Sequence, residues 1–321
     1  MSDKVRLITF ERLPNPVSPD LPETLAQAVA ALAEEWTVFE SHYLQQPGIS
    51  GITQPFDDWS AGCDLRDRFR SGQLSGVGFR SRVESAESEA LPDWISWETP
   101  AASVGELLCP SAETRQRMQD ADFCWLHVAE SVDESSVGSL KQVVELISSW
   151  SAGPRDLTLI TALHGTVADQ QTPFASLLWE SRIRVPLWMH VADRPAVRVP
   201  IITGSFDIAC TINNVLSGRS SSSAESPAVD APRDLVQLSD FVGCRMEREI
   251  LIRLDRHEAV RTSDFLFVQQ DPADHDDAAV RTEKSSALYA KPEDIWNVND
   301  VSGEYFEVAE RFRQSRHPTV S

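Results

Sequence analysis

The feature that most constrains the fold is a strand–helix–strand pattern in the middle of the chain. Bulky apolar residues from Asp122 to Val128 predict a strand, and apolar residues at helical spacing between Ser135 and Trp150 predict an amphipathic helix. Gly153-Pro154 ends that helical pattern, and the β-branched run Leu157 to Thr161 predicts a second, buried strand. Strands joined through a helix run parallel, so the pattern predicts an open α/β sheet.

A histidine and a glycine, His164-Gly165, follow this second strand closely. Open α/β sheets bind their ligands at the carboxyl ends of the strands. His164 is therefore the first candidate for a functional side chain, and its structural alternative is a hydrogen-bonded histidine at a strand end.

The same periodicities predict further elements along the chain. The predicted strands are Val5 to Phe10, Trp36 to Phe39, Val185 to Val191, Glu249 to Leu254 and Asp264 to Gln269, and the predicted helices are Thr24 to Glu35, Phe174 to Ser181 and Asp207 to Leu216. We expect the last two strands to be antiparallel neighbours. The helix at Asp207 should end at Gly218, and Asp207 itself should cap or orient it.

Composition excludes several classes of protein. The 321 residues carry a net charge of −20, which repels phosphate backbones and excludes nucleic acid as a partner. No run reaches the roughly 18–20 apolar residues of a membrane span, and the N-terminus lacks the apolar core of a secretory signal. The five cysteines are widely spaced without a C-x-x-C pair, which is typical of reduced thiols in a cytoplasmic protein.

Four short motifs follow one another along the chain in an order that resembles one known family. They are Thr161-Ala162-Leu163-His164-Gly165, Arg184-Val185-Pro186-Leu187, Phe206 to Thr211, and Leu288 to Val301 with the sequence LYAKPEDIWNVNDV. The first three resemble the T-S-D-H-G, R-V-P-L and V-D-L-x-P-T segments of the sulfatase family of the alkaline-phosphatase superfamily. The fourth resembles that family's closing motif. The chain is identified as a degenerate, shortened member, with the missing length mainly between Tyr43 and Asp122.

This resemblance implies a specific α/β architecture. The family has a mostly parallel central sheet flanked by helices and a small C-terminal α+β subdomain packed on the core. Transferred to this chain, residues 1–218 form the sulfatase-like core and residues 236–321 the C-terminal subdomain. Residues 219–235 are rich in Ser and Pro, which predicts a linker or loop between the two.

The resemblance also implies a metal site that this chain has largely lost. The family's late metal-binding Asp falls at Leu163, which offers no lone pair to a cation. The Asp that ends the family's first strand falls at Glu11, so Glu11 and His164 are the vestigial metal candidates. One carboxylate and one imidazole seldom hold Ca²⁺ or Mg²⁺, but they could contribute to a Zn²⁺ site. The structural alternative for Glu11 is a solvated carboxylate at a strand end.

The nucleophile expected of the family is also missing. The C-x-P-x-R or S-x-P-x-R motif of sulfatases is absent after Tyr43, and Ser50 is a weak catalytic candidate whose structural alternative is a turn residue. His127 stands where the family places histidines around the substrate, but the second histidine of that motif is gone. His127 and His164 are thus candidates for substrate binding, and packing is the alternative role of His127.

Three functions remain open from the sequence. The first is a sulfatase-like protein that has lost ester hydrolysis and serves as a binding or regulatory partner, with no cofactor. The second is an active hydrolase of sulfuric or phosphoric esters with a rearranged site that uses Ca²⁺, Mg²⁺ or Zn²⁺. The third is a binding protein for a small anionic ligand, without chemistry. The partner is accordingly a protein or a small anion.

Overall fold

The computed structural model describes most of the predicted elements. The described residues are 3–13, 23–45, 65–81, 92–98, 101, 103–131, 137–148, 153, 156–165, 178, 180–218, 231–241, 246–254, 257–270, 286–294 and 297–316. Among them, no helix is long and apolar enough to cross a membrane.

The core of the protein is an eight-stranded, mostly parallel sheet with the strand order β4-β3-β5-β1-β6-β7-β2-β8. Only β7, among these eight, runs antiparallel to its neighbours. The strands are β1 (Val5–Arg12), β2 (Thr37–Tyr43), β3 (Gly76–Arg80), β4 (Ser96–Trp97), β5 (Phe123–Ser131), β6 (Leu157–His164), β7 (Arg184–Val191) and β8 (Arg198–Gly204). The predicted α/β class with a mostly parallel sheet is confirmed.

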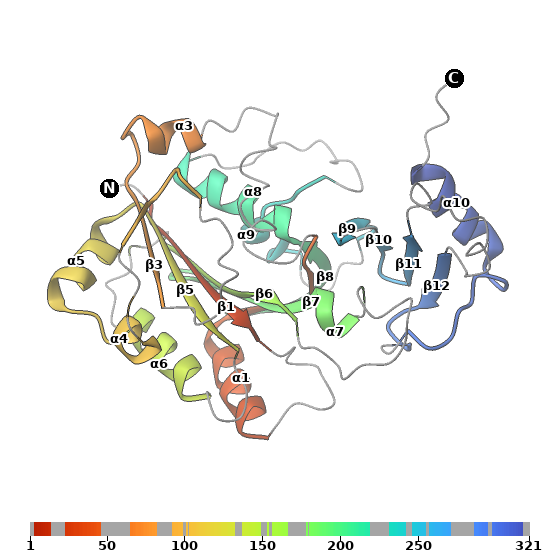
Figure 1. Cartoon of the computed structure of the whole chain (residues 1–321), viewed down its shortest axis with the longest axis horizontal. Helices are drawn as coiled ribbons and strands as arrows, with labels where there is room; N and C mark the ends of the chain where they lie inside the picture. Colours follow the sequence, from red (N-terminus) through yellow and green to blue (C-terminus); the bar gives the residue numbers. More distant parts are fainter. Residues whose placement is uncertain are drawn as a thin grey trace, which may run out of the picture.

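Helices cover both faces of this sheet (Figure 1). The described helices are α1 (Glu23–Glu35), α3 (Leu65–Arg70), α4 (Val104–Leu108), α5 (Ala112–Asp120), α6 (Val137–Ser148), α7 (Glu180–Ile183), α8 (Ser205–Leu216), α9 (Leu235–Leu238) and α10 (Phe306–Arg316). One hydrophobic cluster joins α1, α4, α5 and α6 to one face, and another joins α3, α8 and α9 to the other. Because both faces are covered, β1 is buried at every position from Val5 to Phe10.

The predicted strand–helix–strand unit is present as β5, α6 and β6. The two strands are parallel, but they flank β1 on either side instead of pairing with each other. β6 also extends to His164, so Leu163 lies inside the strand and is 1% exposed. The end of the predicted helix from Phe174 to Ser181 appears as α7, and residues 174–177 and 179 lie outside the described residues.

A second, antiparallel sheet occupies the C-terminal part of the chain, in the order β12-β11-β10-β9. Its strands are β9 (Ile250–Leu254), β10 (His257–Arg261), β11 (Phe265–Gln270) and β12 (Ser286–Ala290), and α10 packs on one side through Phe312. The expectation that the strands at Glu249 and Asp264 are neighbours is wrong. Between them lies β10, whose sequence HEAVR has two polar residues at its start and too little apolar alternation to predict a strand.

Candidate functional site

Three sequence-predicted residues meet at the carboxyl edge of the large sheet. Glu11 and His164 lie at the ends of β1 and β6, and His127 lies within the neighbouring strand β5, opposite Thr9, so the topology brings the three residues together. Glu11 Oε1 lies 3.5 Å from His164 Nε2, and Glu11 Oε2 lies 3.8 Å from His127 Nε2. The His127 side chain is 3% exposed, whereas those of Glu11 and His164 are 39% and 31% exposed. We call these three residues the strand-end site.

A buried hydrogen-bond chain fixes the His127 ring. Trp125 Nε1 donates to Thr9 Oγ1 at 2.9 Å, and Thr9 Oγ1 lies 3.1 Å from His127 Nδ1. Burial lowers the pKa of His127 to about 4, and the charge of Arg80 acts in the same direction. The ring is therefore neutral at pH 7. Its Nδ1 is engaged by Thr9, which leaves Nε2 facing the carboxylate of Glu11.

Positive side chains surround the histidines. Burial lowers the pKa of His164 to about 4, and the charges of Arg12 and Arg182 lower it further. Arg80 lies directly opposite His127 in the register of the parallel strands β3 and β5. The site thus has two neutral imidazoles, guanidinium groups on β1, β3 and α7, and the Glu11 carboxylate. This charge balance favours an anion over a cation.

Leu163, which the sequence motifs align with a metal-binding carboxylate, packs in the core beside Glu11. The β1–β6 ladder pairs Arg12 with His164, so the preceding residues, Glu11 and Leu163, lie side by side. Leu163 is packed in the hydrophobic cluster on the α8 side of the sheet. Hard divalent cations need several oxygen ligands, and here one carboxylate meets two imidazoles. Across the described part of the chain, no group of three His, Cys, Asp or Glu residues is arranged to hold a metal ion.

Ser50, the weak catalytic candidate, lies outside the described residues. Sequence reasoning also missed Thr9 and Arg80. The signal for Thr9 is its position two residues before Glu11 on the same face of a strand.

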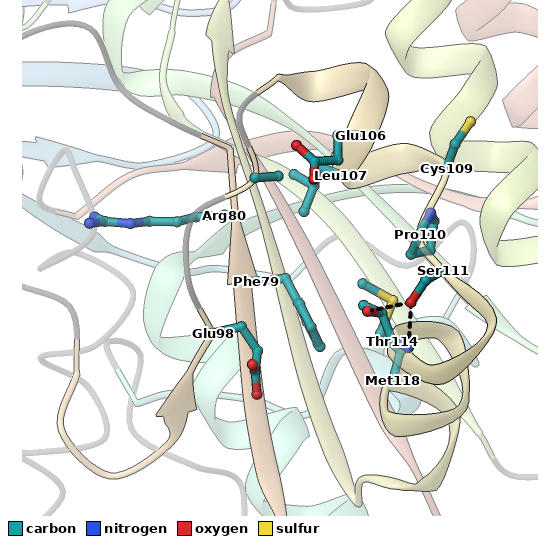
Figure 2. Close-up of a pocket in the computed structure, with 11 residues that line it drawn as sticks. Phe79, Arg80, Glu98, Glu106, Leu107, Cys109, Pro110, Ser111, Thr114 and Met118 are labelled. Atoms are coloured by element: carbon teal, nitrogen blue, oxygen red, sulfur yellow. Dashed lines mark hydrogen bonds between the residues drawn. The ribbon is translucent and has the colours of Figure 1, made fainter.

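A described pocket lies beside β3, α4 and α5, and Arg80 is one of its lining residues. It has a volume of about 310 Å³ and is lined by apolar side chains such as Phe79, Leu107 and Met118, which belong to the cluster under α4 and α5. Figure 2 shows Arg80 extending away from Ser111 in this pocket. The Ser111 hydroxyl accepts from the Thr114 N–H and caps α5, so this polar group is already used.

Comparisons with known proteins find the same fold at very low sequence identity. No protein-family model matches the chain, and no curated protein sequence matches it. The crystal structure of Ps i-CgsB in complex with k-i-k-neocarrahexaose aligns with a TM-score of 0.67 and 9% identity, over 99% of this chain and 92% of that chain. A phosphonate monoester hydrolase of Agrobacterium radiobacter aligns with a TM-score of 0.65 and 12% identity, over 98% and 94%.

A third solved structure with this fold belongs to a known superfamily. A protein in the alkaline phosphatase superfamily from Vibrio parahaemolyticus aligns with a TM-score of 0.59 and 14% identity, over 96% of this chain and 88% of that chain. The chain therefore has the fold of sulfatases and of the alkaline phosphatase superfamily. The resemblance inferred from the sequence motifs is confirmed at this level.

Proposed function

We propose that this protein is a sulfatase-fold binding protein that has lost ester hydrolysis. The observation that carries the proposal is the burial of Leu163, which the flanking register pairs Phe10–Ala162 and Arg12–His164 place beside Glu11 at the end of β1 and β6. In this superfamily the resemblance places metal-binding carboxylates at both positions. A leucine that is 1% exposed and packed in the core cannot supply a ligand to a cation in the site.

The ligand that we propose is a small anion. Guanidinium groups hydrogen-bond oxyanions in a charge-assisted manner, and Arg12, Arg80 and Arg182 lie around the two histidines. In the described part of the chain, neither Arg12 nor Arg80 forms an ion pair with a carboxylate. The protein as a whole is strongly acidic, so this local excess of positive charge distinguishes the site from the rest of the surface.

An activity assay tests the loss of hydrolysis. Purified protein would be incubated with an aryl sulfate and an aryl phosphate, in chelator and with Ca²⁺, Mg²⁺, Mn²⁺ or Zn²⁺ in turn. We expect no metal-dependent turnover by the wild type, and therefore no difference in turnover between the wild type and Glu11→Gln. The matched control is Glu258→Gln on β10, because the Glu258 side chain is 37% exposed and that of Glu11 39%.

Metal-dependent turnover that Glu11→Gln abolishes and Glu258→Gln preserves would overturn the proposal. It would favour the active hydrolase with a rearranged site. A further loss of turnover in Ser50→Ala would then identify its nucleophile.

A binding measurement tests the anion separately. Calorimetric titration with inorganic sulfate in the presence of chelator should give a saturable signal. Arg12→Gln should weaken it about tenfold, the effect of losing roughly 1.5 kcal/mol of charge-assisted hydrogen bonding. The control is Arg253→Gln, which removes a 66% exposed arginine on β9 and should leave the affinity unchanged. Equal effects of the two substitutions would contradict binding at the strand-end site.

The cellular location belongs to the proposal as well. Cys124 is a buried thiol and Cys109 an exposed one, and neither forms a disulfide. Both support the cytoplasmic location expected from the cysteine spacing, in which thiols stay reduced.

A further inference from the structure

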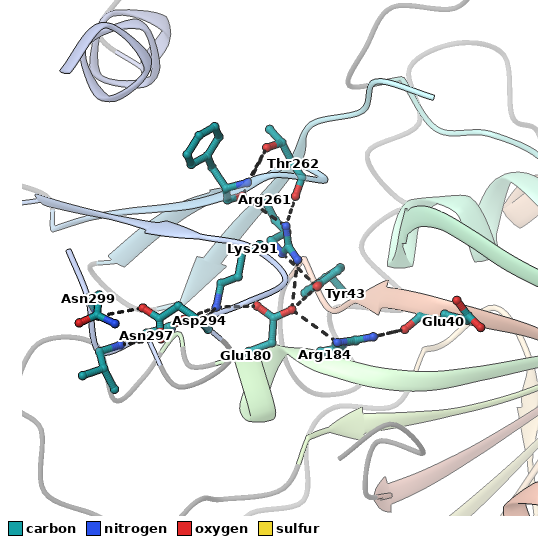
Figure 3. Close-up of polar contacts among 12 residues, drawn as sticks. Glu40, Tyr43, Glu180, Arg184, Arg261, Thr262, Lys291, Asp294, Asn297 and Asn299 are labelled. Carbon is teal, nitrogen blue, oxygen red and sulfur yellow. Dashed lines mark hydrogen bonds and ion pairs between the residues drawn. The ribbon is translucent and has the colours of Figure 1, made fainter. Parts of the chain in front are cut away.

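A buried cluster of charges surrounds Glu180, the first residue of α7 (Figure 3). The Glu180 side chain is 5% exposed and lies 3.3 Å from both Arg261 Nη2 and Lys291 Nζ. Arg184 Nη1 lies 3.9 Å from it, and the Tyr43 hydroxyl donates a hydrogen bond to it. Four side chains thus converge on one carboxylate.

The cluster joins the two sheets of the protein. Tyr43 ends β2 and Arg184 begins β7 in the large sheet, whereas Arg261 ends β10 and Lys291 follows β12 in the small one. Burial acts to raise the pKa of Glu180, but the neighbouring cations and the Tyr43 hydrogen bond outweigh it and lower the pKa. The carboxylate is therefore ionised at neutral pH and holds the cations of both sheets.

The same short helix is also hydrogen-bonded to the end of β6, next to the strand-end site. The backbone N–H of Gly165, directly after His164, donates to the carbonyl of Arg182 at 3.0 Å. The Arg182 charge acts on His164. With only four residues, α7 cannot hold its own conformation, so its orientation depends on such anchors.

We infer that Glu180 is a positioning residue for the strand-end site: by holding the cations of the small sheet, it fixes α7 and, through α7, Arg182 and the His164–Gly165 strand end. The inference goes beyond the proposed function, because it concerns how the site is built and holds whatever the site binds. In this arrangement the small C-terminal sheet stabilises a site whose own residues all belong to the large sheet and α7.

The protonation state of His164 shows whether Glu180 holds α7 in place. The charged and titratable groups that face it are Glu11 and Arg12 from β1, His127 from β5 and Arg182 from α7. If α7 loosens, a guanidinium moves away and water enters, and both changes favour the protonated imidazole. The pKa of His164 should then rise from about 4 toward its ordinary value of 6.5.

The test is an NMR titration of the seven histidines in the full chain, for wild type and Glu180→Gln. We expect the His164 pKa to rise by about one unit or more in Glu180→Gln and less in Glu180→Asp, which keeps the charge. The His127 pKa should change less, because Thr9 holds that ring. The matched control is Asp207→Asn, which breaks a buried ion pair with Arg248 elsewhere and should leave His164 unchanged.

An unchanged His164 pKa in folded Glu180→Gln would overturn the inference, and so would an equal rise in Asp207→Asn. If Glu180→Gln does not fold, Lys291→Met removes one small-sheet cation at similar volume, and the same two outcomes decide. Arg182→Gln tests the final link directly, since it should raise the His164 pKa without disturbing the charge cluster. These readouts need no ligand, so failure of the proposed binding function would leave them intact.

Discussion

Arg248 donates to both carboxylate oxygens of Asp207, at 2.8 Å and 3.0 Å, and both side chains are 1% exposed. Asp207 also accepts hydrogen bonds from the backbone N–H groups of Gly204, at 2.8 Å, and Arg233, at 2.7 Å. The expectation that Asp207 caps α8 is therefore confirmed. The same carboxylate thus holds Arg233 and Arg248, two described residues between α8 and β9.

Breaking this pair should strongly destabilise the fold. Arg248→Met leaves the buried carboxylate of Asp207 without its guanidinium partner, and such losses cost about 3–5 kcal/mol. Urea unfolding measures the change in the free energy of unfolding. The control is Arg253→Met on β9, whose ion pair with Glu258 is exposed and should contribute at most about 1 kcal/mol. Similar losses in the two variants would show that Arg248 contributes little to stability.

Stability should fall in acid because of buried neutral histidines. His42 is fully buried with its Nδ1 3.0 Å from Thr203 Oγ1, and burial lowers its pKa to about 3. In the unfolded chain the imidazole has an ordinary pKa near 6.5, so between pH 6.5 and 3 the unfolded state binds more protons. The stabilisation is complete above pH 6.5 and is lost as the pH falls toward 3, by about 2 kcal/mol at pH 5.

Urea unfolding at pH 7.5 and pH 5 measures this loss. His42→Gln should reduce the acid-dependent loss by about 2 kcal/mol, because one group no longer takes up its proton on unfolding. His190→Gln is the matched control. Burial lowers the pKa of His190 as well, but this residue is only partly buried and should account for a smaller share. An acid loss that is unchanged in His42→Gln would contradict the assignment.

The residues at the ends of the strands were predictable from the sequence, whereas the distant side chains that contact the neighbouring helix α7 were not. Glu11 and His164 each follow a strong apolar run, so the carboxyl edge of a parallel sheet brings them together. Glu180 gives no local signal, because its partners lie 81 residues away at Arg261 and 137 residues away at Tyr43. Such a cluster depends on tertiary packing, which periodicity does not report.

Strand β3, which carries Arg80, escaped prediction for a local reason. Its sequence GVGFR contains two glycines, which normally indicate a loop. In the structure both glycines admit a neighbouring side chain: a Cβ at Gly78 would lie 2.6 Å from the Trp97 ring, and one at Gly76 would lie 2.6 Å from Ile95 Cγ2. The glycines therefore serve close packing at the edge of the sheet.

Gly78→Ala should accordingly be destabilising. The Trp97 ring has little freedom to retreat, because its Nε1 donates to the Pro92 carbonyl at 3.0 Å and its ring lies 5.6 Å from that of Trp125. Overpacking of this kind costs about 1–3 kcal/mol. Gly138→Ala in α6 is the control: apart from its chain neighbours and its own helix backbone, no described atom lies within 4 Å of the added Cβ, so it should stabilise the helix slightly. Thermal unfolding of both variants checks this, and a stabilising Gly78→Ala would exclude the packing explanation.

The last prediction concerns the leucine that stands beside Glu11. If Leu163 is a core residue, Leu163→Ala should lower the free energy of unfolding by about 2–5 kcal/mol, because it removes buried methyl groups and leaves a cavity. If Leu163 instead lined an open site, water would fill the space and the loss would be small. Leu251→Ala on β9 is the control, since Leu251 is only partly buried and should cost less. Urea unfolding measures the loss in the free energy of unfolding for both variants. A smaller loss in Leu163→Ala than in Leu251→Ala would indicate that Leu163 lines the candidate site and not the core.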